Sequence, residues 1–272
     1  MKIKYLGTAA AEGFPAVFCN CEFCVEARRL GGKNIRTRSQ ALINDDLLID
    51  FPADTYSHFL NNGIEGDKIK NLLITHSHED HFYPNDLQNR GGAYAHNMRA
   101  EKLGVFGCED VYKRLEGFLV DYTQVFAQQL KPFEEVNIGD YKVTPLPARH
   151  HFKKGAFIYI IKGDKTILYA HDTGYFYDEV FEYIEKNKIT FDFVTMDCTN
   201  VNIPISDVDG HMGIPNNLRL VEKLSAIGAI TDSTVKVINH FSHNGEPIQH
   251  KLEEQVGKYG ILVAYDGFEV IV

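Results

Sequence analysis

Short apolar runs rich in β-branched residues recur along the whole chain, and turn residues separate them. Such runs are typical of β-strands. Asn44-Asp45 and Gly163-Asp164 each separate two of these runs, which predicts two β-hairpins. Including the N-terminal segment, we expect strands over residues 1–7, 41–43, 47–50, 71–75, 105–107, 142–146, 156–161, 166–170, 191–196, 235–239 and 268–272.

Between the strands, apolar residues recur every three or four positions, as they do on the buried face of a helix. Pro247 suits the first turn of the last such segment, and Gly260 suits its end. Hairpins combined with strand–helix alternation predict an α/β fold with helices outside one mixed sheet or two sheets. The expected helices are residues 53–62, 109–118, 178–188, 214–227 and 247–259.

Length and composition indicate a globular protein. The 272 residues, 44% of them hydrophobic, suit one large domain or at most two small ones. No apolar run approaches the roughly 20 residues of a membrane span. The N-terminal segment reaches Gly7 without the apolar core of a secretion signal. We therefore expect a cytoplasmic protein with no membrane partner.

The net charge of −9 argues against a nucleic-acid partner, because proteins that grip polynucleotides usually gather Lys and Arg on one face. The basic residues between positions 28 and 38 are the nearest to such a cluster. We interpret them as a solvated face or a small anion site. An anionic substrate stays compatible with this charge, because bound divalent cations would dominate the local field.

The most informative segment combines an apolar run, residues 71–74, with His76-Ser77-His78-Glu79-Asp80-His81. Imidazole nitrogens and carboxylate oxygens suit Zn, Mn or Fe(II), and ligands this close together can serve two ions. Three later apolar runs also end in metal-ligand residues. A lone histidine or aspartate after a strand is more often structural, but the joint occurrence in this order indicates a metal site. These residues are the pair His150-His151, Asp172, and the spaced pair His240 and His243.

The pattern His-x-His-x-Asp-His, followed by His, Asp and His, resembles the metallo-β-lactamase superfamily. The resemblance implies a four-layer αββα sandwich, with Asp50 as a carboxylate that orients a ligand histidine. The family spacing after Pro147 favours His150 over His151, and a histidine at position 78, where redox di-iron members have glutamate, favours the hydrolytic branch. The implied ligands are His76, His78 and His150 for one ion, Asp80, His81 and His240 for the second, and Asp172 bridging.

Three of the five cysteines, Cys19, Cys21 and Cys24, fall within six residues. In a chain without a secretion signal, such a cluster favours a metal over disulfides. Three thiolates are one ligand short of a tetrahedral zinc site, and His243 would supply the fourth. We therefore expect one structural zinc, with a zinc-binding loop at about 15–30. Cys108 and Cys198 are interpreted as buried apolar residues.

Further motifs narrow the resemblance. The segments 7–15, 196–198, 210–211 and 265–267, with the cysteine motif, resemble the phosphoribosyl cyclic phosphate phosphodiesterases of the carbon–phosphorus lyase pathway over nearly the whole chain. This implies a single domain over 1–272, a homodimer, a structural zinc on the cysteines plus a late histidine, and His211 acting near the leaving group. Residues 82–87 lack the glycine that the superfamily often has after the last histidine of the motif, and residues 88–97 are longer than in that family and are expected to border the active site.

The expected function is hydrolysis of a small phosphodiester with two divalent ions (Mn, Zn or Fe). In this hypothesis Asp80 holds the attacking water and His211 is the general acid. Alternatives on the same metals are an RNA-processing nuclease, a lactonase or a β-lactamase. Acidity argues against the first and the missing signal against the last. A non-catalytic biosynthetic accessory protein is a further alternative, since the PQQ-biosynthesis protein B group shares the cysteine motif, but the complete ligand set argues against it.

Overall fold

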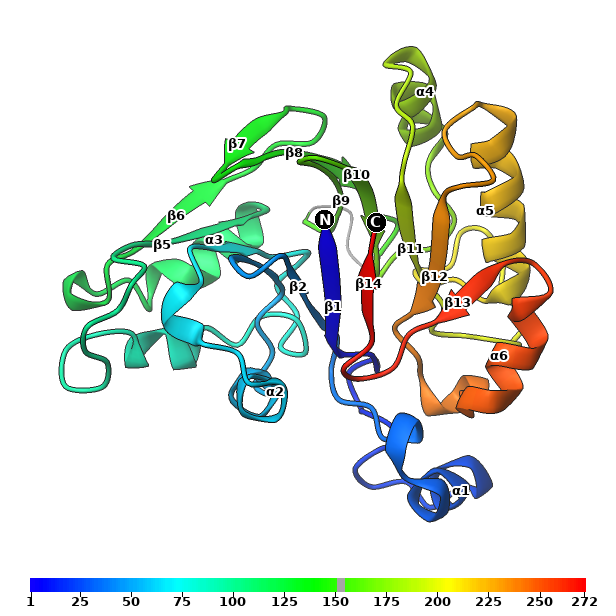
Figure 1. Cartoon of the computed structure of the whole chain (residues 1–272), viewed down its shortest axis with the longest axis horizontal. Helices are drawn as coiled ribbons and strands as arrows, with labels where there is room; N and C mark the ends of the chain where they lie inside the picture. Colours follow the sequence, from blue (N-terminus) through cyan, green and yellow to red (C-terminus); the bar gives the residue numbers. More distant parts are fainter. Residues whose placement is uncertain (151–154) are drawn as a thin grey trace.

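The computed structural model describes residues 1–150 and 155–272. Within this part of the chain, two seven-stranded sheets face each other, and helices lie on the outer faces (Figure 1). The predicted αββα sandwich is confirmed. His151 lies outside the described residues, so the choice between His150 and His151 can be followed only for His150.

The first sheet mixes antiparallel and parallel pairs. Strands β3 to β6 run parallel to one another, whereas β1 is antiparallel to both of its neighbours. In spatial order its strands are β14 (Glu269–Ile271), β1 (Lys2–Gly7), β2 (Gln40–Ile43), β3 (Leu47–Ile49), β4 (Asn71–Leu73), β5 (Leu103–Gly107) and β6 (Val125–Gln129).

The second sheet is parallel from β10 to β13 and antiparallel from β7 to β10. Because β9 is antiparallel to both β8 and β10, these two strands point the same way. The order is β13 (Ile261–Val263), β12 (Val235–Asn239), β11 (Phe193–Asp197), β10 (Thr166–Ala170), β9 (Phe157–Lys162), β8 (Tyr141–Pro147) and β7 (Val136–Ile138).

Helices cover the two outer faces, and one helix stands apart. Figure 1 shows α2 (Thr55–Asn62) and α3 (Glu109–Glu116) beside the first sheet. The second sheet is covered by α4 (Asp178–Lys186), α5 (Ile214–Ala226) and α6 (Gln249–Gly257), while α1 (Glu22–Leu30) carries the last cysteine of the motif. Short 3-10 turns are η1 (Gly32–Asn34), η2 (Gly66–Lys68), η3 (Pro84–Asn89), η4 (Asp121–Thr123) and η5 (His243–Gly245). No described helix has the length and apolar character needed to cross a membrane.

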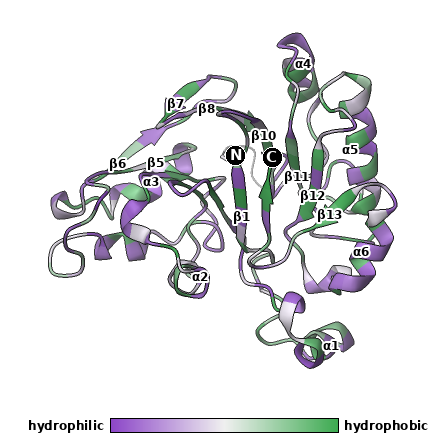
Figure 2. Cartoon of the chain, viewed as in Figure 1, coloured by the Kyte–Doolittle hydropathy of each residue, from purple (hydrophilic) through white to green (hydrophobic). Residues whose placement is uncertain are grey.

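Two apolar layers hold the sandwich together. One lies between the sheets and joins residues of both, such as Ile3, Tyr159 and Val237. The other lies between the second sheet and helices α4 to α6, with Ile184 and Leu220 fully buried. Each such side chain stabilises the fold by about 1.5–3 kcal/mol. Figure 2 shows the strands largely hydrophobic and the helices mixed, as expected for helices with one buried face.

Every strand and helix expected from the sequence has a counterpart within a few residues of its bounds. Four elements were missed: β6, β7, β13 and α1. The two edge strands β6 and β7 carry exposed polar residues, so pairing with β5 and β8 decides their conformation. The zinc-binding loop expected at about 15–30 is helical from Glu22 onward. Pro247 precedes α6, which begins at Gln249, so its expected place in the first turn is wrong.

Candidate dinuclear metal site

The C-terminal ends of parallel strands bring the predicted ligands together. Segment 76–81 follows β4, His150 follows β8, Asp172 follows β10 and His240 follows β12. Strands β8, β10 and β12 point the same way in the second sheet, so the loops at their ends share one edge of the sandwich. Loops at the carboxyl edge of a rigid sheet are the usual position of reactive groups.

The first group consists of three imidazoles. Nε2 of His76 lies 2.9 Å from Nδ1 of His78, which lies 3.3 Å from Nε2 of His150. The other ring nitrogen of His150, Nδ1, lies 3.2 Å from the carbonyl oxygen of Gly210, so it donates there and leaves Nε2 as the ligand atom. Burial lowers the pKa of both His76 and His150, which keeps them neutral and able to bind a cation.

The second group surrounds the carboxylate of Asp172. Its Oδ2 lies beside Nε2 of His81, 3.2 Å from Nε2 of His240 and 3.8 Å from Nε2 of His76. Nε2 of His81 is also 3.3 Å from Oδ2 of Asp80. Within each group, one ligand atom from every member lies within 4.8 Å of the others, and Asp172 also reaches the first group. The structure thus brings all seven predicted ligands together.

Three buried atoms at the centre of this cluster have no hydrogen-bond partner among the described residues: Nε2 of His81, Oδ2 of Asp172 and Nε2 of His240. Oδ2 of Asp172 lies at ion-pair distance from both ring nitrogens, without the alignment of a hydrogen bond. Leaving buried polar atoms unpaired is costly. A divalent cation among them would satisfy all three, so the residues fit the metal that their chemistry implies.

The electrostatics of the cluster also favour cations. Burial would lower the pKa of His81, but the carboxylates of Asp172, Asp80 and Asp50 raise it well above its usual value. Burial would raise the pKa of Asp80, yet His81 holds it well below its usual range. His240 and His81 likewise hold the pKa of the buried Asp172 well below its usual range, so Asp80 and Asp172 are ionised at neutral pH and their field attracts a cation.

The backbone is strained at three of these positions. Asp50, Asp172 and His240 have φ values of 65°, 50° and 63°, in the left-handed region that non-glycine residues rarely adopt. Asp50 and His240 follow their strands directly, and Asp172 stands two residues after the end of β10. Such strain costs about 1–3 kcal/mol per residue and persists where the surrounding structure fixes it, most often at functional sites.

Asp50 takes the position expected of it behind the ligands, and Thr75 joins it. Oδ2 of Asp50 lies 2.7 Å from Nδ1 of His81, while Oδ1 accepts from the backbone N–H of Thr75 at 2.8 Å. The Thr75 hydroxyl donates to the same carboxylate and lies 3.1 Å from Nδ1 of His76. Sequence analysis missed Thr75, because only the fold brings its hydroxyl between two ligand rings.

His211 lies on the opposite side of Asp172. Its Nδ1 is 3.3 Å from Oδ1 of Asp172 and 3.2 Å from Oδ2 of Asp197. Burial would lower the pKa of His211, but these carboxylates, Asp197 foremost, raise it to about 9. The ring is therefore protonated at neutral pH. A β-carbon at Gly174 would collide with the carbonyl of Asp209, so glycine allows the loop that carries His211 to approach Asp172.

Sequence analysis also missed a role for Asp197 and its neighbour Thr199. Asp197 ends an apolar strand in the same way as the segment before Asp172, and that repeated pattern was the available signal. The hydroxyl of Thr199 lies 2.7 Å from Nδ1 of His240 and 3.2 Å from Nδ1 of His211. Both residues are buried behind the cluster.

A cavity of about 460 Å³ opens onto the cluster. Among the described residues that line it there is no Lys or Arg. An anionic ligand would therefore meet positive charge there only on bound cations or protonated histidines. Its size suits a small molecule and not a folded polymer. The lining residues are Ala10, Ala11, Glu12, His78, Asp80, His150, Asp172, Thr199, Gly210, His211, His240, Ser242, His243 and Asn244.

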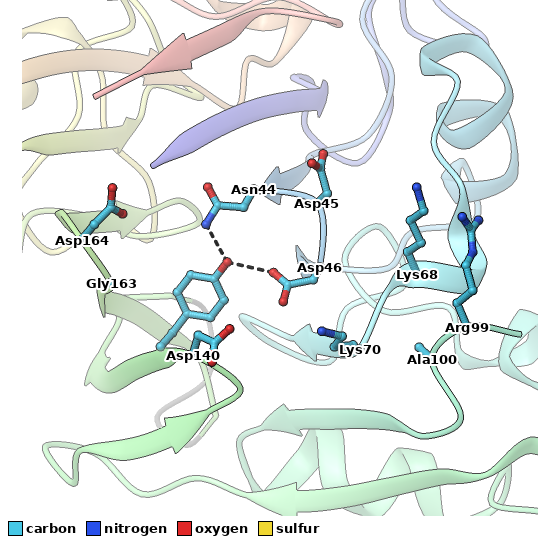
Figure 3. Close-up of a pocket in the computed structure, with 11 residues that line it drawn as sticks. Asn44, Asp45, Asp46, Lys68, Lys70, Arg99, Ala100, Asp140, Gly163 and Asp164 are labelled. Atoms are coloured by element: carbon cyan, nitrogen blue, oxygen red, sulfur yellow. Dashed lines mark hydrogen bonds between the residues drawn. The ribbon is translucent and has the colours of Figure 1, made fainter.

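Two other cavities lack this chemistry. The one in Figure 3, about 550 Å³, lies at hairpin turns far from the strand ends that carry the ligands. Its Tyr141 hydroxyl donates to Asp46 and accepts from Asn44, and the described lining holds neither His nor Cys. The segment 88–97, expected beside the active site, lines a separate cavity of about 290 Å³ together with apolar residues such as Phe59. That expectation is wrong for the described residues, because apolar contacts draw the segment under the first sheet.

The cysteine motif meets His243 as predicted. Nδ1 of His243 lies 3.4 Å from Sγ of Cys19 and 3.7 Å from Sγ of Cys21. Cys24 in the first turn of α1 completes a group whose ligand atoms lie within 4.8 Å of one another. The hydrogen bond with His243 lowers the pKa of Cys21 to about 6, whereas burial raises the pKa of Cys24 to about 12. The donor set fits a tetrahedral zinc.

Comparison with known proteins agrees with the observed fold. The family model for the Beta-lactamase superfamily domain matches residues 49–237, more than half of the chain. A diphosphatase of the PhnP family shares the fold at 20% identity over 99% of this chain and 97% of that chain, with a TM-score of 0.76. Zn-bound PqqB from Methylobacterium extorquens matches at 16% identity over 100% of both chains, with a TM-score of 0.75. Human tRNase Z, short form, matches at 14% identity over 100% and 99%, with a TM-score of 0.67. No curated protein sequence matches the chain.

Proposed function

This chain belongs to the metallo-β-lactamase superfamily, and from that premise we propose that it is a metal-dependent phosphodiesterase. Its proposed substrate is a small cyclic phosphodiester such as a phosphoribosyl cyclic phosphate. The observation that carries the proposal is the position of Asp172, whose two oxygens face both ligand groups and, on the other side, His211.

His76, His78 and His150 would hold one cation, Asp80, His81 and His240 a second, with Asp172 between them. Two divalent cations bound there would supply Lewis-acid stabilisation of the phosphate and a hydroxide at neutral pH. Asp80 is ionised and lines the cavity, so its carboxylate would accept a hydrogen bond from the attacking water and orient it.

His211 is the proposed general acid. Its Nδ1 is engaged by Asp197 and Asp172, which leaves Nε2 to donate a proton to the departing alkoxide. A phosphodiester needs such a donor, because an alkoxide is a poor leaving group. Lactone opening also expels an alkoxide, so the half-buried His211 beside the cluster would serve either substrate, and the substrate comparison below separates the two.

The test is hydrolysis of bis(p-nitrophenyl) phosphate by protein stripped of metal and reloaded with Mn, Zn or Fe. We expect metal-dependent turnover that Asp80→Ala lowers by about 10²–10³-fold. His211→Ala should lower it by about 10²-fold. Glu79→Ala and His250→Ala are the matched controls, because neither side chain is a member of the two ligand groups.

Substrate class is tested next with a ribose cyclic phosphate, a diphosphate ester and a lactone. The diphosphate ester is included because one structural neighbour is a diphosphatase of the PhnP family. Preference for the cyclic phosphate supports the proposal. Faster lactone turnover, or no turnover although ions bind, overturns it in favour of a lactonase or a non-catalytic accessory protein.

A further inference from the structure

The carboxylate of Asp197 is anchored by the connection between β11 and α5. The residue ends β11 and has no exposed surface. Its Oδ1 accepts from the backbone N–H groups of Thr199 at 3.0 Å and Met212 at 2.8 Å. The hydroxyl of Thr199 donates to Oδ2 at 3.1 Å. Three donors thus fix the orientation of this carboxylate before it meets any imidazole.

Two imidazoles share this Asp–Thr pair. Oδ2 of Asp197 lies 3.2 Å from Nδ1 of His211, and Oγ1 of Thr199 lies 2.7 Å from Nδ1 of His240. Since the Thr199 hydroxyl donates to Asp197, its lone pairs accept from His240. Both rings therefore carry their proton on Nδ1 and present Nε2 forward. They lie 5.8 Å apart and within 12° of parallel.

The first sheet contains a similar pair, Asp50 and Thr75, with one difference. Asp50 contacts His81 at 2.7 Å, and Thr75 contacts His76 at 3.1 Å, so both imidazoles behind that pair are proposed metal ligands. The pair in the second sheet instead joins one proposed ligand, His240, to one ring that belongs to the reaction. The Asp–Thr pair of the first sheet makes no such link, because both of its imidazoles are proposed metal ligands.

We propose that Asp197 and Thr199 are positioning residues. Together they hold the rings of the metal ligand His240 and the proton donor His211 in one orientation relative to each other. The proposal rests on the proposed function for His211 alone, since the role toward His240 needs only metal binding. Asp197 supplies the charged partner of His211 at 3.2 Å, whereas the Thr199 hydroxyl, also 3.2 Å from Nδ1 of His211, makes its shorter contact of 2.7 Å with His240. The two substitutions should therefore have separable effects.

The experiment compares Asp197→Asn and Thr199→Val with the wild type on two diesters, bis(p-nitrophenyl) phosphate and diphenyl phosphate. The second has the poorer leaving group and depends more on a proton donor. Asp197→Asn should lower kcat/KM about 10-fold on bis(p-nitrophenyl) phosphate, as expected for loss of a group that orients a ligand. On diphenyl phosphate the loss should be about 10 times larger again. Thr199→Val should lower kcat/KM on the two diesters by the same factor, because the carboxylate of Asp197 still holds His211.

Metal retention provides a readout that needs no turnover. After dialysis against buffered Mn or Zn, both variants should bind one ion of the dinuclear cluster about 10–100-fold more weakly. Asp50→Asn should weaken metal binding and lower kcat/KM equally on the two diesters. Asp207→Asn is the matched control, because this carboxylate lies on the same loop as His211 but pairs with Arg219. Circular dichroism and thermal melting verify that each variant folds.

Equal loss on both diesters for Asp197→Asn would overturn the role toward His211, and unchanged metal retention in both variants would overturn the role toward His240. If Asp197→Asn folds, the double variant Asp197→Asn/His211→Ala adds a check, since positioning predicts that His211→Ala already removes the leaving-group effect. If it does not fold, Thr199→Val tests the role toward His240, and Asp197→Glu, which keeps the charge but shifts the carboxylate, tests the role toward His211. If the wild type hydrolyses neither diester, the proposed function fails, whereas the retention measurement still tests His240.

Discussion

The two ligand clusters of this chain lie three residues apart at His240 and His243, yet the fold builds them in different ways. The His/Asp cluster collects side chains from strand ends in both sheets, so the apolar layers hold it in place. The cysteine cluster takes three ligands from six consecutive residues beside a small apolar group that includes Phe14 and Ile248. The first cluster is positioned by the core, whereas the second has only this small apolar group beside it and is proposed to gain stability from a bound zinc.

This difference separates catalysis from stability. A preorganised cluster can lose its ions without losing its shape, because strand ends and buried Asp–Thr pairs keep the imidazoles oriented. A cluster on a segment with a small core contributes free energy of folding when metal binds. The left-handed backbone at Asp172 and His240 agrees with this, since strain of that kind persists only in a well-supported structure.

Metal removal should have the largest effect. Exhaustive chelation is expected to lower phosphodiester turnover by about 10³-fold or more, with activity restored on adding Mn, Zn or Fe. Far-UV circular dichroism should change little, because the sheets do not need the ions. Loss of the sheet signal on chelation would break the comparison between the two clusters.

Asp172→Ala should affect activity alone. We expect kcat/KM to fall about 10³-fold and metal to be lost from the His/Asp cluster, while one zinc per chain stays on the cysteines. Elemental analysis and kinetics measure both. Asp178→Asn, on the exposed start of α4, is the control and should retain activity. A parallel loss of zinc from the cysteines would show that the clusters are not independent.

Cys24→Ser should affect stability more than chemistry. The chain should lose its cysteine-bound zinc, and the free energy of unfolding should fall by about 3–4 kcal/mol, the loss expected for a ligand present at hundreds of times its Kd. Cys108→Ser is the control, because Cys108 is also buried but bonds the carbonyl of Gly155 and belongs to neither cluster. Equal destabilisation by both substitutions would contradict a structural zinc. Chemical denaturation measures the difference.

Glu12→Gln should give the smallest effect and show how the clusters communicate. Glu12 lines the catalytic cavity, accepts from the Ser242 hydroxyl at 2.6 Å and lies 4.0 Å from Nε2 of His243. Because the side chain is one-third exposed, we expect only a two- to fivefold change in KM. Glu22→Gln on α1 is the control. A loss of more than tenfold would mean that Glu12 contacts the substrate.

Local patterns were enough to predict most of the fold. Apolar runs with turn residues placed the strands because those runs are buried in one of the two layers, and helical periodicity placed α2 to α6. The edge strands β6 and β7 escaped prediction because hydrogen bonds to β5 and β8, and not their own residues, make them strands. The segment 88–97 was placed at the wrong cavity because its contacts are with residues distant in the sequence.

The chemistry of both clusters was determined by the sequence itself, since histidine, aspartate and cysteine at these spacings suit few roles besides metal binding. Tertiary structure decided what spacing cannot encode. It brought His243 to cysteines more than 200 positions away, gave Asp172 its place between two imidazole groups, and put Asp197 and Thr199 behind His240 and His211. The physical reason is that hydrogen bonds and coordination act over about 3 Å, and only the packing of the two sheets brings distant strand ends that close.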